Sequence, residues 1–216
     1  MKLKTDDLLL YAVTDRISMG DRDFDSCIRE AIEGGVTMVQ LREKGLGTEN
    51  LTKKAERIAR ICHEYGLPLI IDDDYKAALA AGADGVHVGA EDTAVSEIRR
   101  VAGDDFIIGA TAKTVDQARQ AEQAGADYLG VGAVFPSPTK KNAIRINPDE
   151  LCVICGSVNI PCVAIGGINR TRLTQLPGKE IAGIAVVSAV FGAEDIRAAA
   201  SDLLSAVKDL KGGRLK

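Results

Sequence analysis

The chain has 216 residues, of which 46% are hydrophobic and 27% are charged, while only 4% are aromatic and none is tryptophan. This composition is typical of a globular protein with packed helices and buried strands. The formal net charge of −4 argues against a nucleic-acid partner, which requires a basic surface.

The N-terminal segment argues against a membrane span or a secretion signal. Its apolar run, residues 8–13, is too short for either purpose, so we expect a cytoplasmic protein with no membrane partner. The cysteines lack the regular spacing of a zinc site or a disulfide framework. We expect reduced, mostly buried thiols at Cys27, Cys62, Cys152, Cys155 and Cys162.

Eight short apolar segments rich in β-branched residues recur along the chain and predict strands. They span residues 8–13, 37–41, 68–72, 84–89, 105–110, 127–133, 161–167 and 183–188. The stretches between them repeat apolar residues at three- and four-residue spacing, which indicates helices. Several of these helices are followed by glycine, a residue that suits the left-handed conformation at a helix C-terminus, in residues 33–37, 80–85 and 123–128.

This alternation predicts an α/β fold, a (β/α)8 TIM barrel that forms a single domain over residues 1–216. We expect its core at about residues 8–209 and a tail at residues 210–216. The continuous apolar strands suit parallel strands covered by helices. Periodicity does not establish that the sheet closes, so an open doubly wound sheet is the alternative.

Polar and charged side chains gather at the C-terminal ends of the predicted strands, where a TIM barrel places its chemistry. Because side chains alternate along a strand, Gln40, Arg42 and Lys44 are expected to face the same way. The later strand ends carry Asp72, Asp73 and Asp74, then His87, Glu91 and Asp92, then Thr111 and Lys113, and finally Ser137, Thr139, Lys140 and Lys141.

Two of these carboxylates, Asp73 and Asp92, predict a magnesium site. Bringing carboxylates from neighbouring strand ends together is costly unless a cation lies between them. Oxygen ligands without cysteine or paired histidine suit Mg²⁺, which completes its shell with water and substrate phosphates. Arg42, Lys44 and Lys140 would hold the remaining phosphate oxygens, so the ligand is expected to be a diphosphate. For Asp74 we favour a cap at a helix start.

A second phosphate feature follows the seventh and eighth predicted strands. Gly166 and Gly167 follow the seventh strand, and residues 186–192 follow the eighth. Backbone N–H groups of glycine-rich turns at this place in a barrel bind a phosphate, and a monophosphate is expected here. We expect His63 and His87 to serve packing, and no spacing indicates a covalent nucleophile.

In combination, these motifs resemble the thiamine-phosphate synthase family, also called thiamine-phosphate pyrophosphorylase. The resemblance covers nearly the whole chain through YAVTD (11–15), VQLREK (39–44), IIDDD (70–74), GADGVHVGAED (82–92), GADYLGVGAVFPSPTKK (125–141), AIGGI (164–168) and VVSAV (186–190). It implies a (β/α)8 transferase that uses Mg²⁺ to join a pyrimidine methyl diphosphate to a thiazole ethyl phosphate. Diphosphate would leave first, and the thiazole nitrogen would then capture the pyrimidine methylene cation.

The resemblance also implies roles for individual residues. Arg42, Lys44 and Lys140 would be catalytic, because they stabilise charge on the departing diphosphate. Asp73 and Asp92 would be the Mg²⁺ ligands. The substrate-binding set would be Gln40, Leu41, Arg42, Glu43, Lys44, Asp72, Thr111, Ser137, Pro138, Thr139, Lys140, Gly167, Val187 and Ser188. Gln40 and Thr111 would lie beside the pyrimidine, and Ser137 to Thr139, Gly167, Val187 and Ser188 would contact the thiazole phosphate.

Three places depart from the family pattern. Asp72 stands where the family usually has an asparagine that helps to bind diphosphate, and Lys113 replaces a histidine. Asn142 and Ala143 replace the Asp and Thr of the loop motif. The alternatives are a thiazole tautomerase-like isomerase and a paralogue that binds thiamine phosphate without catalysis. The isomerase would need no diphosphate site. Small barrels often associate, so a homo-oligomer stays open.

Overall fold

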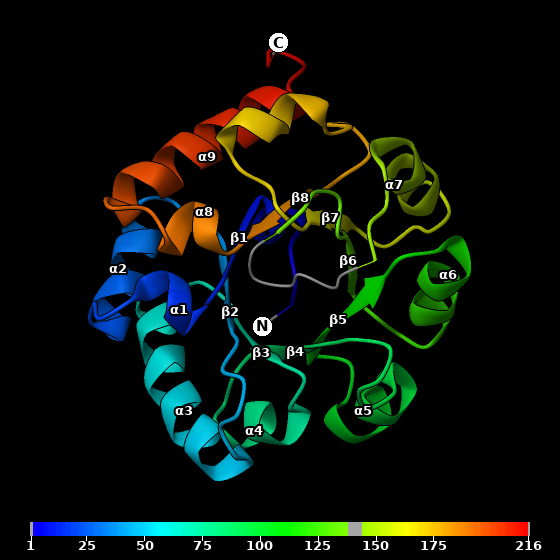
Figure 1. Ribbon diagram of the computed structural model, residues 1–216. Coiled ribbons are helices and arrows are strands. Elements are labelled where there is room, and N and C mark those ends of the chain that lie inside the picture. The colour runs from blue at the N-terminus through cyan, green and yellow to red at the C-terminus, as the bar shows by residue number, and fades with distance from the viewer. Residues whose placement is uncertain (1, 138–143, 216) are drawn as a thin grey trace.

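The computed structural model describes residues 2–137 and 144–215 and contains a closed barrel of parallel strands (Figure 1). Neighbouring strands pair in chain order, and the last pairs with the first, so the sheet has no free edge. This closure confirms the predicted TIM barrel and rules out the open sheet. The strands are β1 (Leu10–Val13), β2 (Met38–Leu41), β3 (Leu69–Asp72), β4 (Gly85–Val88), β5 (Ile107–Ala112), β6 (Tyr128–Gly132), β7 (Cys162–Ile165) and β8 (Gly183–Val186).

Helices surround the barrel and cover its outer face (Figure 1). A 3-10 helix, η2 (Arg170–Gln175), takes the place of an α-helix between β7 and β8, and another, η1 (Thr5–Leu8), precedes β1. The α-helices are α1 (Arg16–Met19), α2 (Phe24–Glu33), α3 (Thr48–Glu64), α4 (Tyr75–Ala80), α5 (Val95–Ala102), α6 (Val115–Gln123), α7 (Pro148–Cys155), α8 (Ser188–Phe191) and α9 (Ile196–Lys211).

Local sequence signals start and end these helices. The Asp74 carboxylate accepts a hydrogen bond from the Ala77 N–H at the start of α4, which satisfies one of the N–H groups left without a partner at a helix N-terminus. Gly35, Gly82 and Gly125 follow α2, α4 and α6 with φ angles of 104°, 67° and 96°, a conformation that glycine adopts without steric cost. The expected cap at Asp74 and the glycine-terminated helix ends are thus confirmed.

The strands separate two hydrophobic layers, because their side chains alternate between the barrel interior and the surrounding helices. The larger layer lies between strands and helices. The inner layer includes the rings of Tyr11 and Tyr128, and Gly109 leaves space for the rings of Tyr128 and His87. A Cβ atom at Gly109 would lie 2.2 Å from Tyr128 Cζ and 2.5 Å from His87 Nδ1. The absence of a side chain there therefore positions two polar rings inside the barrel.

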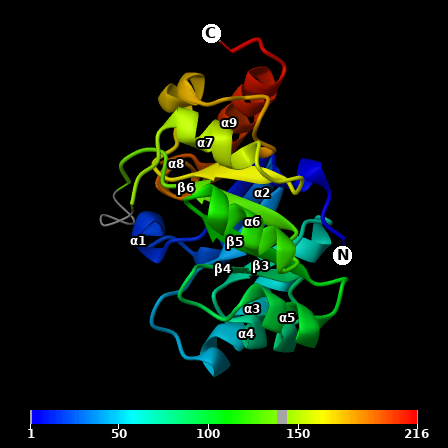
Figure 2. The ribbon, with the colours of Figure 1, turned by 90° about the vertical axis from the view of Figure 1, so that its right-hand side faces the viewer.

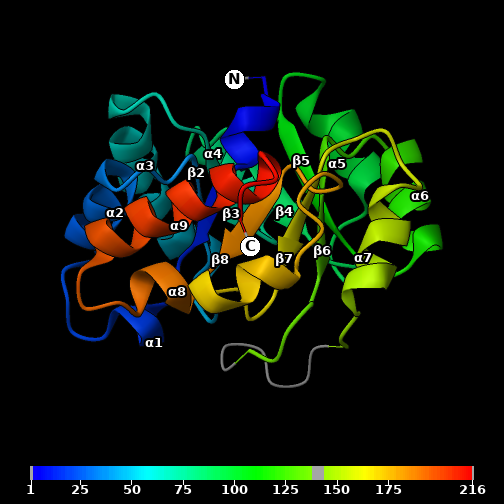
Figure 3. The same cartoon turned by 90° about the horizontal axis from the view of Figure 1, so that it is seen from above.

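The two ends of the barrel carry different segments. Helices α1 and α8 lie at the end formed by the carboxyl ends of the strands, whereas the N-terminal segment lies at the opposite end (Figures 2 and 3). The last helix extends to Lys211, so the first residues of the expected tail are helical. All five cysteines are free thiols, and all but Cys152 are buried. In the described parts of the chain, no helix has the length and apolar character needed to cross a bilayer.

Candidate active site

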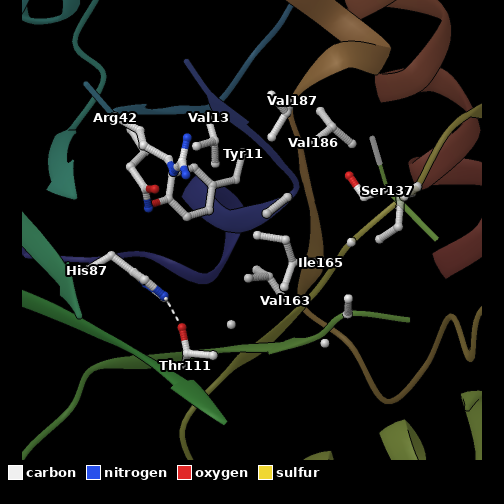
Figure 4. A pocket seen from close by; sticks show the side chains of 18 of the residues that line it. Tyr11, Val13, Arg42, His87, Thr111, Ser137, Val163, Ile165, Val186 and Val187 are labelled. Carbon is white, nitrogen blue, oxygen red and sulfur yellow. Dashed lines mark hydrogen bonds between the residues drawn. The ribbon is translucent and has the colours of Figure 1, made fainter. Parts of the chain in front are cut away.

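A cavity of about 170 Å³ opens among the carboxyl ends of the strands. Figure 4 shows Arg42 and Tyr11 on one side of it and Ser137 on the other, with His87 and Thr111 in contact between β4 and β5. The residues predicted to bind substrate that line this cavity are Gln40, Arg42, Asp72, Thr111, Ser137, Gly167, Val187 and Ser188. The fold therefore brings most of the predicted set to one place.

Two cations and two carboxylates form an ion-pair cluster after β2 and β3. Lys44 Nζ lies 3.1 Å from Asp72 Oδ2 and also pairs with Asp73, while Arg42 Nε lies 3.5 Å from the same Asp72 oxygen. Burial alone lowers the pKa of Lys44, but the bonds to Asp73 and Asp72 outweigh it, so the pKa lies above its usual value. Burial and the Asp73 charge raise the pKa of Asp72, and Lys44 partly offsets that rise. The extra carboxylate thus sits against the two cations expected to hold a diphosphate.

The two predicted metal ligands interact with each other. Burial raises the pKa of Asp92, and the neighbouring Asp73 carboxyl raises it further. Asp92 also accepts a hydrogen bond of 2.8 Å from the Gly89 N–H, and Asp73 has a φ of 63°, which is uncommon for a residue other than glycine. Within residues 2–137 and 144–215, no three His, Cys, Asp or Glu side chains converge as a metal cluster. Mg²⁺ binds through one or two carboxylates plus water and phosphate, and this pair of oxygen donors fits that requirement.

A chain of hydrogen bonds runs through the floor of the cavity. Gln40 Nε2 lies 2.6 Å from Tyr11 Oη, which lies 2.9 Å from Tyr128 Oη. Tyr128 Oη lies 3.1 Å from His87 Nδ1, and His87 Nε2 lies 3.0 Å from Thr111 Oγ1. Burial lowers the pKa of His87 to about 4, so the imidazole is neutral near pH 7. Burial also raises the pKa of Tyr11 and Tyr128, and both remain phenols.

The opposite side of the cavity is built from backbone. Gly167 has a φ of 61°, and a Cβ atom there would lie 2.3 Å from the Pro136 carbonyl oxygen. Arg172 Nη1 donates to the carbonyls of Gly167 (2.6 Å) and Pro136 (3.1 Å), which ties the loops after β6 and β7 together. Val187 and Ser188 complete this wall where α8 begins. Of the described residues that line this side, none carries a charge.

Some predicted residues lie away from the cavity. The Leu41 side chain is buried in the layer between strands and helices. Glu43 turns toward α3, where its Oε1 lies 2.8 Å from Lys54 Nζ, and this ammonium lies 3.5 Å from the centre of the Phe24 ring. The residues Pro138, Thr139 and Lys140 lie outside the described residues.

Sequence reasoning missed several contributors. Tyr11 and Tyr128 fall within predicted strands, but no role at the site was predicted for them or for Arg172. Strand alternation would have placed Tyr11 inside the barrel, two residues before the cavity residue Val13. The contact between Tyr11 and Tyr128 joins residues 117 positions apart and is set by closure of the barrel.

Comparison with known proteins shows which family the chain resembles. The family model described as thiamine monophosphate synthase matches residues 10–190. The thiamine-phosphate synthase of Clostridium tetani is 43% identical over 94% of this chain and 97% of its own length. Thiamine-phosphate synthase 2 of Streptococcus pneumoniae is 46% identical over 88% of this chain and 91% of its own.

A solved structure is similar over nearly the whole barrel. Thiamine phosphate pyrophosphorylase from Pyrococcus furiosus superposes with a TM-score of 0.88 and 38% identity, covering 95% of this chain and 98% of its own. The chain therefore belongs to the thiamine monophosphate synthase family and is an enzyme of the transferase class.

Proposed function

We propose that this enzyme joins 4-amino-2-methyl-5-(diphosphomethyl)pyrimidine to 4-methyl-5-(2-phosphoethyl)thiazole in a Mg²⁺-dependent reaction, giving thiamine phosphate and diphosphate. The observation that carries the proposal is the contrast between the two sides of one cavity. The ion-paired side chains of Arg42 and Asp72, at the ends of β2 and β3, line one side, with Lys44 paired to Asp72 beside them, and uncharged backbone lines the side formed by β7 and β8. These sides suit a diphosphate and a monophosphate, respectively.

The charged side would bind and release the diphosphate. Arg42 and Lys44 now contact Asp72 and Asp73, and we propose that the diphosphate oxygens take over these contacts when substrate binds. Asp73 and Asp92 would hold Mg²⁺, which would supply positive charge to the departing diphosphate. Lys140 would add a further cation. Arg42, Lys44 and Lys140 act as catalytic groups because charge on the diphosphate grows as its bond to carbon breaks.

The floor and the backbone side would hold the two rings in line. Gln40 and Thr111 would contact the pyrimidine, while Ser137, Gly167 and Ser188 would contact the thiazole phosphate, together with Val187, Pro138 and Thr139. The bond between the pyrimidine methylene carbon and the diphosphate oxygen breaks, and both electrons leave with diphosphate. The thiazole nitrogen then donates its lone pair to the methylene cation. Holding the two rings together would account for much of the rate, and the apolar side chains of Val163, Ile165 and Val186, which line the cavity, would exclude water that could otherwise capture the cation.

We also propose the cytoplasm as the site of this reaction. All five cysteines are free thiols, and a reducing compartment keeps thiols in that form. The two phosphorylated substrates would be the small-molecule partners.

The test is release of diphosphate from purified protein supplied with both precursors, first with Mg²⁺ and then with EDTA. Release that requires both precursors and the metal supports the proposal. Release that proceeds equally in EDTA removes the role of Mg²⁺. An absence of release from a folded protein that isomerises a thiazole carboxylate phosphate points to the tautomerase-like activity instead.

A further inference from the structure

The hydrogen-bond chain in the barrel floor joins the two side chains proposed to read the pyrimidine ring. It runs from Gln40 through Tyr11, Tyr128 and His87 to Thr111. Gln40 and Thr111, the two ends of this hydrogen-bond chain, line the cavity. Tyr11 and His87, which lie between them in the chain, also line it. Tyr128 is fully buried beneath the cavity and does not line it. Any effect of Tyr128 on a ligand must therefore pass through its neighbours.

Counting donors fixes the direction of the first two bonds. Gln40 Nε2 can only donate, so Tyr11 Oη accepts that hydrogen bond. Among the described residues, Tyr11 Oη has one other partner, the hydroxyl of Tyr128. If Tyr128 donated to Tyr11, the Tyr11 proton would have no acceptor among the described residues although the Tyr11 side chain is only 1% exposed, which is unfavourable. Tyr11 therefore donates to Tyr128.

The same count fixes the protonation of His87 and the role of Thr111. The Tyr128 proton is directed to His87 Nδ1, which must then be the unprotonated ring nitrogen. A neutral imidazole carries its proton on the other nitrogen, so His87 Nε2 donates to Thr111 Oγ1. The Thr111 proton cannot return to His87 and remains available to the cavity. At the opposite end, Gln40 Oε1 remains available as an acceptor.

We propose that this one-way chain makes Tyr128 a positioning residue, which fixes Thr111 as a donor and Gln40 as an acceptor toward the ring that binds. The ligand class selected in this way is a nitrogen heterocycle that carries an amino group. Its amino N–H would face Gln40, and a ring nitrogen with a free lone pair would face Thr111. The inference rests on the proposed function for the identity of the ligand, but the chain itself exists without any ligand.

The direct test is the tautomer of His87 in the ligand-free protein, read from the nitrogen chemical shifts of ¹⁵N-histidine. The chain contains two histidines, so the variant His63→Gln assigns both signals. We expect the proton on Nε2 and a pyridine-type Nδ1. A proton on Nδ1 would overturn the proposal, because it requires the amide of Gln40 to be turned over and every bond in the chain to be reversed.

The variant Tyr128→Phe removes one hydroxyl from the middle of the chain. We expect His87 to populate both tautomers, and the KM for the pyrimidine diphosphate to rise about three- to tenfold, while the KM for the thiazole phosphate stays unchanged. Tyr11→Phe interrupts the same chain one bond away and is expected to shift the tautomers likewise, even if Tyr128→Phe does not fold. Tyr65→Phe is the matched control, because Tyr65 donates to Glu33 at the protein surface.

The two readouts separate this inference from the proposed function. Equal increases of both KM values in Tyr128→Phe would contradict a role in reading the pyrimidine. If the wild-type protein released no diphosphate from any pair of precursors, the proposed function would fail, and the tautomer would still decide whether the one-way chain exists.

Discussion

The two sides of the cavity mouth differ in the groups that they would offer to an anion. After β2 and β3, Arg42 and Lys44 form ion pairs with Asp72 and Asp73, and the Lys44 side chain is 56% exposed. At β7 and β8 the wall is backbone, and the guanidinium of Arg172 fixes the loop at Gly167 through two carbonyls. A group that departs with growing charge needs cations that can follow it. A phosphate that stays on the substrate and only anchors it needs a rigid binding site.

The largest effect is expected on the charged side, from Asp73→Asn. Asparagine tolerates the positive φ of this position but removes the charge of a proposed metal ligand, so the rate of diphosphate release should fall about 100-fold or more. The measurement is the rate as a function of Mg²⁺ concentration. Asp74→Asn is the control, because asparagine is also a good helix N-cap and should leave the rate unchanged. A normal rate for Asp73→Asn at limiting Mg²⁺ would remove Asp73 from the metal site.

The floor beneath both sides should respond to acid through His87. Burial lowers its pKa from 6.5 to about 4, so between these values the unfolded state binds a proton that the folded state does not. The contribution of His87 to the free energy of unfolding is therefore complete above pH 6.5. It falls by up to about 3 kcal/mol as the pH falls toward 4. Denaturant unfolding of wild type and His87→Gln at pH 7 and pH 4 measures it. If the free energies of unfolding of the two proteins differed by the same amount at pH 7 and at pH 4, the result would contradict a neutral imidazole at His87.

The backbone side is tested by Gly167→Ala. The added Cβ would meet the Pro136 carbonyl at 2.3 Å and displace the loop, so the KM for the thiazole phosphate should rise about tenfold with less change for the pyrimidine. Gly103→Ala is the control, because Gly103 has a φ of 77° with open space around it. Equal effects of the two substitutions would mean that backbone strain alone, rather than the rigid binding site, accounts for the change.

The smallest effect is expected from Asp72→Asn, which sharpens the comparison on the charged side. Removing this carboxylate takes away the ion pairs of Asp72 with Arg42 at 3.5 Å and with Lys44 at 3.1 Å, while Lys44 keeps its pair with Asp73, and diphosphate should bind about two- to fivefold more tightly. Calorimetry with inorganic diphosphate and Mg²⁺ measures this change. Asp202→Asn, which loses a surface pair with Arg170, should leave the affinity unchanged. Weaker binding to Asp72→Asn would show that Asp72 helps to hold the ligand.

Local patterns in the sequence were sufficient to predict the barrel and much of the mouth. Apolar strands, the cap at Asp74 and glycines such as Gly82 act over a few residues, so a sequence window contains their whole cause. Strand alternation also predicted that Gln40, Arg42 and Lys44 face the same way, and Gln40 and Arg42 line the cavity. The prediction weakened where β2 ends at Leu41, because alternation stops with the strand, and Lys44 is not among the residues that line the cavity. Glu43 entered the predicted binding set through the family resemblance, and it pairs instead with Lys54 in α3.

The interior network could not be predicted in this way. The contact between Tyr11 and Tyr128 depends on barrel closure and on the empty space at Gly109, neither of which has a local signature. His87 was expected to serve packing, and the structure places it inside the barrel in contact with Tyr128 and Thr111. Polar rings inside a closed barrel form hydrogen bonds with one another although they are far apart in the sequence. Their partners can therefore be identified only once the fold is known.

The most direct test of the account is a crystal structure of the protein with thiamine phosphate, diphosphate and Mg²⁺. The account predicts diphosphate against Arg42 and Lys44, with the metal on Asp73 and Asp92, and the phosphate of thiamine phosphate beside Gly167 and Ser188. Diphosphate bound on the glycine side, or a metal bound away from both carboxylates, would contradict the assignment of the two sides.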